Sequence, residues 1–194
     1  MFLTSRSVTS LLDAFASSDP TPGGGSAAAL AGAMGASLLA MVAGMPKTKT
    51  GAPESRAALD AARGRLMSAR ATLIDLVDRD SAAYDLVVSA YRRPKGTDAE
   101  KAERKDAIQQ AMRVATEVPL ETATTCAAAL ADAAVVAEHG NPNAASDVGT
   151  AMALLKAGIR GAELNVEINV GSLSDAGLVS KVRATLAAVT KAAG

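Results

Sequence analysis

The sequence has very few aromatic residues and a single cysteine. Phe, Trp and Tyr together make up 2% of its 194 residues, and tryptophan is absent. The one cysteine, Cys126, excludes an internal disulfide framework and a metal site built from several cysteines. Because it lies beside threonines and alanines, we expect a small buried hydrophobic residue rather than a nucleophile.

The sequence also has no excess of positive or negative charge. Lys and Arg total 20, and Asp and Glu total 20. No basic stripe with interleaved aromatic residues is present, so nucleic acid is not expected as a partner. The first ten residues contain one arginine and no apolar segment followed by a cleavage site, so no signal peptide is expected.

One long uncharged segment, residues 26–45, raises the question of a membrane span, because its length could cross a bilayer. Alanine and glycine dominate it, leucine and isoleucine are few, and no second such segment is evident. We expect instead the central helix of a soluble bundle, a cytoplasmic location and no membrane partner.

Alanine supplies much of the 49% hydrophobic content, and it is the strongest helix former. The chain is therefore predicted to be all-α, a single-domain bundle of long Ala-rich helices over residues 1–194. Since alanine side chains contribute little burial each, the backbones must pack closely. Helices are expected at 7–17, 26–45, 54–91, from Thr97 or Asp98, from Pro119 to Gly140, from about Asn143, and from Ser174 or Asp175 to Ala192.

The segment Leu164–Val170 is an exception, because it alternates apolar and polar residues as a strand does. No second alternating run exists with which it could pair, and a lone strand leaves its backbone hydrogen bonds unmade. We therefore expect this segment to be helical as well.

The stretch Pro20–Ser26, PTPGGGS, places two prolines and three glycines directly before the uncharged helix. The start of a helix presents unpaired N–H groups and partial positive charge, which suit an anion or a developing negative oxygen. Gly23, Gly24 and Gly25 would let a ligand approach the backbone, and Ser26 could cap the helix or bond the ligand. A tight turn into a closely packed helix explains the pattern equally well.

Two further groups of polar residues are candidates for chemistry. At about 100° per residue, one stripe of the helix from Asn143 carries an acid, two glycines and two amides, namely Asp147, Gly158, Gly161, Asn165 and Asn169. A helix crossing with buried amides is the alternative. Asp80 and Tyr84 share one face of the long helix, although charged positions there commonly form the solvated side.

These pieces, in this order, resemble the cyclodeaminase/cyclohydrolase family of folate enzymes. The family includes the formimidoyltetrahydrofolate cyclodeaminase domain and the stand-alone methenyltetrahydrofolate cyclohydrolases. The resemblance runs from about Leu11 to Leu186 and is carried by Pro20–Ser26, Asp80 with Ala83 and Tyr84, Val118–Pro119, Gly140–Asn141, Ser146–Asp147 and Asn165–Asn169. Lys47 and Lys49 are separated by a threonine, where the family commonly has a compact lysine cluster.

The resemblance implies an all-helical homodimer that binds a tetrahydrofolate derivative in a cleft near the glycine-rich turn. It implies acid/base catalysis by a carboxylate, with Asp147 as the first candidate and Asp80 as the second, and no metal or cofactor beyond the tetrahydrofolate substrate. The implied substrate-binding residues are Gly23, Gly24, Gly25 and Ser26 at the turn, Lys47 and Lys49 for the glutamate tail, and Tyr84, Asn141, Asn165 and Asn169.

The expected activity is methenyltetrahydrofolate cyclohydrolase or formimidoyltetrahydrofolate cyclodeaminase. The chain has no attached formimidoyltransferase, which tilts the expectation slightly towards the cyclohydrolase. A non-catalytic folate-binding module or a structural dimer is the alternative.

Overall fold

The computed structural model describes residues 2–193, and within them the chain is all-α, as the sequence predicts. The helices are α1 (Val8–Phe15), α2 (Gly24–Ala43), α3 (Pro53–Tyr91), α4 (Asp98–His139), α5 (Ala145–Val170) and α6 (Ala176–Ala193), with short 3-10 turns η1 (Leu3–Ser5) and η2 (Pro142–Ala144). The strand-like segment Leu164–Val170 lies inside α5.

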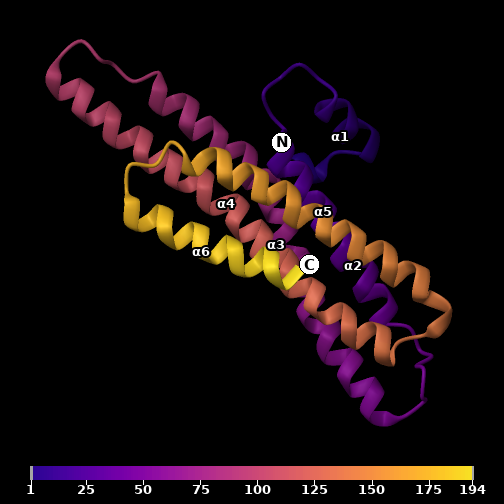
Figure 1. The fold of residues 1–194 in the computed structure, drawn as a ribbon. Helices are drawn as coiled ribbons and strands as arrows, with labels where there is room; N and C mark the ends of the chain where they lie inside the picture. Colours follow the sequence, from indigo (N-terminus) through magenta and orange to yellow (C-terminus); the bar gives the residue numbers. More distant parts are fainter. Residues whose placement is uncertain (1, 194) are drawn as a thin grey trace.

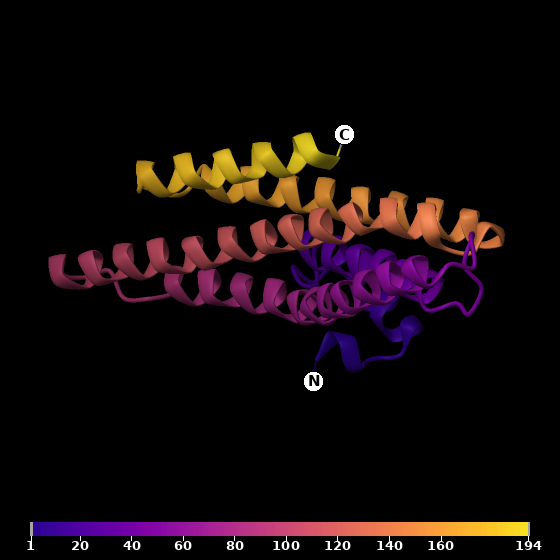
Figure 2. The same ribbon diagram turned by 90° about the horizontal axis from the view of Figure 1, so that it is seen from below.

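Helices α2 to α5 form an antiparallel bundle in which α2 packs against the other three (Figure 1). Helix α6 covers α4 and α5, and α1 lies on the opposite side of the bundle (Figure 2). Because α3 and α4 are much longer than α2, their connected ends project beyond the bundle as a helical hairpin. The start of α2 therefore faces the middle of α3 and α4 and the last turns of α5.

Most helix boundaries follow from local chemistry that is visible in the sequence. Thr97 and Glu100 form a capping box at the expected start of α4, and His139 is the last residue before the Gly140 cap. The expected helix start at Pro119 is wrong, because α4 continues through this buried proline. A proline inside a helix leaves the carbonyl four residues earlier without its partner, and here Asn169 supplies a substitute donor to Ala115.

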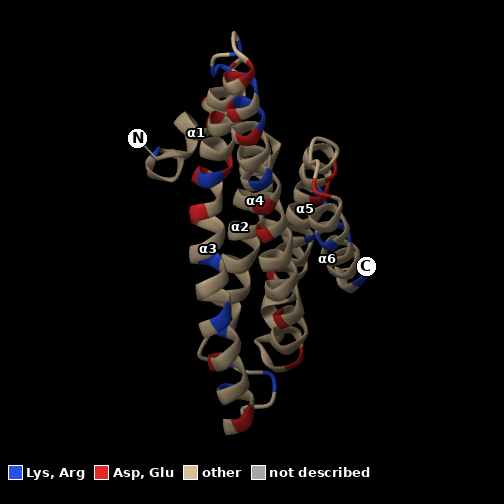
Figure 3. Cartoon of the chain, turned by 90° about the vertical axis from the view of Figure 1, so that its left-hand side faces the viewer, with Lys and Arg blue, Asp and Glu red and all other residues tan. Residues whose placement is uncertain are grey.

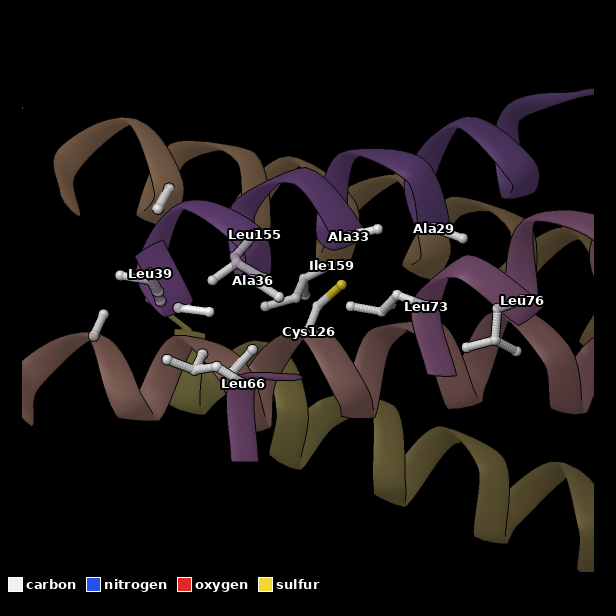
Figure 4. Close-up of a cluster of buried hydrophobic side chains, with 14 of the residues drawn as sticks. Ala29, Ala33, Ala36, Leu39, Leu66, Leu73, Leu76, Cys126, Leu155 and Ile159 are labelled. Atoms are coloured by element: carbon white, nitrogen blue, oxygen red, sulfur yellow. The ribbon is translucent and has the colours of Figure 1, made fainter. Parts of the chain in front are cut away.

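The core depends on small residues that bring α2 and α5 together. Ala29 and Ala36 are fully buried, and Ala36 lies beside Leu155 (Figure 4). A Cβ atom on Gly35 would lie 2.7 Å from Cγ of Leu155, and one on Gly158 would lie 3.0 Å from the Ala28 carbonyl oxygen. Only glycine therefore fits at these crossings, and the expectation of close backbone packing is confirmed.

Cys126 lies in this core, with its sulfur directed between α2 and α5 (Figure 4). Burial raises the pKa of its thiol to about 12, so it remains protonated at neutral pH. This confirms the expectation of a buried hydrophobic residue rather than a nucleophile.

Two helices, α2 and α4, are long and apolar enough to cross a membrane by length and composition. The expectation of one such segment is therefore wrong, because the charged early turns of α4 conceal its apolar second half. In α2, 61% of the apolar window is buried inside the bundle, and the charged residues are on the surrounding helices (Figure 3). A buried core helix is thus a sufficient explanation for α2.

Candidate functional site

The site is built where the start of α2 meets the middle of α3. Gly25 lies directly against Asp80, because a Cβ atom on this glycine would be 2.8 Å from Oδ2 of the carboxylate and closer still to Oδ1. The next residue, Ser26, is fully buried. Its hydroxyl lies 3.0 Å from Oδ2 of Asp80 and 2.9 Å from the Val77 carbonyl oxygen. Ser26 therefore holds the carboxylate and does not cap α2.

The environment of Asp80 raises the pKa of its carboxyl group above the usual 3.8. Burial is the largest cause, since it disfavours the charged form. Hydrogen bonds from the hydroxyl and the backbone N–H of Ser26 act in the opposite direction. The positive end of α2 also favours the carboxylate. A carboxyl group with a raised pKa is suited to both accepting and returning a proton.

Asp80 borders a cavity of about 390 Å³, within the range of about 300–1,000 Å³ that is usual for small-molecule sites. Four elements line it. The turn before α2 supplies Pro20, Thr21, Gly23, Gly24 and Gly25; α3 supplies Asp80, Ala83, Tyr84 and Val87; α4 supplies Met112 and Ala115; and α5 supplies Asn165 and Asn169.

The two amides that line this cavity, Asn165 and Asn169, are each held by a hydrogen bond from the side-chain nitrogen to a backbone carbonyl. Nδ2 of Asn165 donates to the Gly161 carbonyl at 2.8 Å, and Nδ2 of Asn169 donates to the Ala115 carbonyl at 2.6 Å. The first N–H groups of α2 have no helical acceptor and supply donors on another side. The cavity therefore combines acceptors, backbone donors and an apolar wall, which together suit a flat polar ring.

Four of the expected site residues lie far from this cavity. Lys47 and Lys49 follow α2 at its other end, about 30 Å away along the helix. Asn141 accepts a hydrogen bond from the Asn143 backbone N–H at 3.0 Å and caps η2. Asp147 is in the first turn of α5, about 27 Å along the helix from Asn165. Within one chain, Asp147 and the glycine turn therefore do not border the same cavity.

Comparison with known proteins decides the family. The family model described as formiminotransferase-cyclodeaminase matches residues 7–188. The chain belongs to this family. This confirms the resemblance inferred from the motifs.

Three relatives show how closely the chain follows the family. It is 41% identical over 170 residues to a methenyltetrahydrofolate cyclohydrolase of Methylorubrum extorquens, covering 88% of this chain and 82% of that protein. It is 33% identical to the formimidoyltransferase-cyclodeaminase of Rattus norvegicus, covering 84% of this chain but only 30% of the rat protein. The crystal structure of formiminotetrahydrofolate cyclodeaminase from Thermotoga maritima superposes with a TM-score of 0.86 at 28% identity, covering 97% and 90% of the two chains.

A larger hollow of about 530 Å³ lies on the other side of the turn in this formiminotransferase-cyclodeaminase family member. It is lined partly by the N-terminal segment and contains Arg6 together with Asp78 and Asp85. It includes neither Asp80 nor the two amides, so the smaller cavity is the better candidate for chemistry. Among residues 2–193, no group of three or more His, Cys, Asp or Glu side chains is placed to hold a metal ion.

Sequence reasoning missed the apolar wall that this family member builds from Val87, Met112 and Ala115. Met112 and Ala115 follow the charged first turns of α4, and periodicity gave no reason to place them at a ligand. It also missed the link between Ser26 and Asp80, which are far apart in sequence and which only the packing of α2 on α3 brings together.

Proposed function

We propose that this protein is a methenyltetrahydrofolate cyclohydrolase in which Asp80 is the acid/base group. The named relatives confirm the expected enzyme class, one that acts in folate one-carbon chemistry. The choice of the cyclohydrolase rests on the 41% identity to the Methylorubrum protein, which extends over most of both chains. The choice of Asp80 rests on its position, because it is the one carboxylic acid among the described residues that line the cavity.

In the proposed reaction, water attacks the cationic methenyl carbon that bridges N5 and N10 of the folate. The ionised Asp80 takes one proton from this water as the C–O bond forms, and its negative charge stabilises the neighbouring cation. When the bond from this carbon to N5 breaks, Asp80 returns the proton to N5. The second water proton is released, and the product is the 10-formyl compound.

The remaining cavity residues would bind and orient the pterin ring. Oδ1 of Asn165 and Oδ1 of Asn169 would accept hydrogen bonds from ring N–H groups, and Tyr84 would cover the open side of the cavity. The half-exposed tyrosine, with 41% of its surface accessible, suits that position. Because only protons and water are transferred, we propose that no metal or cofactor is needed beyond the tetrahydrofolate substrate.

The cyclodeaminase reaction is the second candidate, supported by the Thermotoga structure and by the rat relative. In it, N10 attacks the formimino carbon and ammonia leaves, and the same carboxyl group would transfer the protons. Two assays with the purified protein separate these functions. Loss of the methenyl absorbance without ammonia supports the cyclohydrolase, and ammonia release from the formimino substrate supports the cyclodeaminase. Calorimetric binding without either turnover would identify a non-catalytic folate binder and contradict the proposal.

We further propose a cytoplasmic homodimer that binds neither nucleic acid nor membrane. Apolar side chains remain exposed on the outside of the bundle, including Leu164 and Ile168 on α5, which are 49% and 76% accessible. Asp147 can reach a substrate only if a second copy brings that end of the bundle to the cavity. Light scattering on the detergent-free protein gives the assembly, and a monomer would exclude a role for Asp147 in the reaction.

A further inference from the structure

Pro119 changes the hydrogen bonding of α4 next to the proposed folate cavity. Proline has no backbone N–H, so the Ala115 carbonyl oxygen, four residues earlier, lacks its helical donor. The proline ring also crowds this carbonyl. An interior carbonyl of this kind needs another partner.

Asn169 supplies that partner from the neighbouring helix. Its Nδ2 atom lies 2.6 Å from the Ala115 carbonyl oxygen, a bond that joins α5 to α4. Ala115 and Asn169 both line the cavity that contains Asp80, whereas Pro119 is buried and does not line it. The Ala115 carbonyl, which lacks its hydrogen bond within α4, thus accepts one from a side chain of the site.

Asn165 provides a comparison within the same cavity. Its Nδ2 atom also donates to a carbonyl, but to that of Gly161 on its own helix, where the α-helical N–H bond is available too. The Asn169 amide instead bonds a carbonyl that has been deprived of its helical donor. This makes its orientation dependent on a residue that does not contact the cavity.

We propose that Pro119 is a positioning residue for Asn169. By freeing the Ala115 carbonyl, it anchors the amide nitrogen of Asn169 on α4 and leaves Oδ1 as an acceptor for an N–H group of the substrate ring. The ligand class rests on the proposed folate function, whereas the anchoring itself does not. Helix stability gives no other reason for this proline, because proline is the least favourable residue in a helix interior.

The substitution Pro119→Ala tests this directly. Alanine restores an N–H that competes with Asn169 for the Ala115 carbonyl, so the amide loses its fixed orientation. We expect kcat/KM for the methenyl substrate to fall about threefold to tenfold, mainly through KM, while the melting temperature stays the same or rises. The control Pro94→Ala, in the exposed α3–α4 connection, should leave both unchanged. A purely structural role for Pro119 would lower the melting temperature and leave KM intact, and that result would overturn the proposal.

A double-mutant cycle supplies the second readout. Asn169→Ala removes the side chain that Pro119 is proposed to position, so adding Pro119→Ala in that background should cause no further loss in kcat/KM. Two losses that multiply would show that Pro119 acts independently of Asn169, contrary to the proposal.

Crystal structures of the wild type and of Pro119→Ala keep this inference separate from the folate assignment. We expect the bond between Asn169 Nδ2 and the Ala115 carbonyl in the wild type, and a separation beyond about 3.5 Å or a turned amide in the variant. If the amide keeps the same bond in the variant, the inference fails whatever the substrate is. If the wild type shows no turnover of either folate substrate, the proposed function fails, while the structures still decide the positioning.

Discussion

At the scale of single residues, the proposed acid/base group Asp80 depends on two neighbours. One leaves space for its carboxylate, and the other forms a hydrogen bond with it. Asp80 fits against the start of α2 only because position 25 has no side chain, and it is held there by the buried Ser26. The residue types were recognisable in the sequence, since both Asp80 and the glycine turn stood out. The contact between Ser26 and Asp80 was not recognisable in the sequence. A serine three residues into a helix cannot be told from a capping serine until the neighbouring helix is placed.

Replacing Ser26 with alanine should move the pH dependence of turnover. In the proposed mechanism the ionised form of Asp80 is the base, so activity should fall as pH drops through its pKa, which is raised above 3.8. Ser26 lowers that pKa, and its removal should raise it further. We expect the acidic limb of the pH–kcat profile to shift to higher pH in Ser26→Ala. A limb that stays in place, or moves to lower pH, would show that Asp80 is not the titrating group.

Replacing Gly25 with alanine should displace the Asp80 carboxylate, because the new methyl group would overlap it. A displacement of about 1 Å at a reacting group lowers turnover by about 10²-fold. Gly64 on α3 is the matched control, since a methyl group there meets nothing within 4 Å. Steady-state kinetics of the two variants measure the difference, and equal activity in both would argue against the close contact.

At the level of the helices, tertiary packing determined the helix boundaries and positions that local sequence patterns did not predict. Caps and turn residues predicted most boundaries, because Thr97, Gly140 and Asp175 act within a few residues of themselves. The start expected at Pro119 failed because a side chain of another helix satisfies the freed carbonyl. Periodicity also placed Asp147 on the same face of α5 as Asn165. Their spacing of 18 residues also means about five turns of helix, so the two side chains face different parts of the bundle.

The approach of α2 to α5 should be sensitive to a single methyl group. Gly35→Ala would press a Cβ against Leu155 and the Ala151 backbone, and overpacking of this kind lowers the free energy of unfolding by about 1–3 kcal/mol. Gly64→Ala, in open space on α3, should instead raise it by up to about 1 kcal/mol. Urea denaturation of both variants gives the comparison, and a stabilised Gly35→Ala would contradict the close packing described here.

Across the whole molecule, the candidate site residues chosen from the sequence lie at two opposite ends of the bundle. The glycine turn, Asp80, Tyr84, Asn165 and Asn169 share one cavity, while Lys47, Lys49, Asn141 and Asp147 lie at the other end of the bundle. The order of the motifs along the chain does not show which end of the bundle each one occupies, because every antiparallel helix carries the chain back to the opposite end. The family and the fold were therefore predictable from the sequence, whereas the proposal of Asp80 over Asp147 rests on the three-dimensional arrangement.

The turnover of Asp80→Asn, compared with Asp147→Asn, tests the central assignment most directly. We expect Asp80→Asn to lose about 10²-fold or more of kcat on the methenyl substrate. It should unfold at a temperature no lower than that of the wild type, since a partly buried charge has been removed. The kcat of Asp147→Asn should fall by a smaller factor. Wild-type turnover in Asp80→Asn, with the loss found in Asp147→Asn instead, would contradict the account and place the chemistry at the opposite end of the bundle.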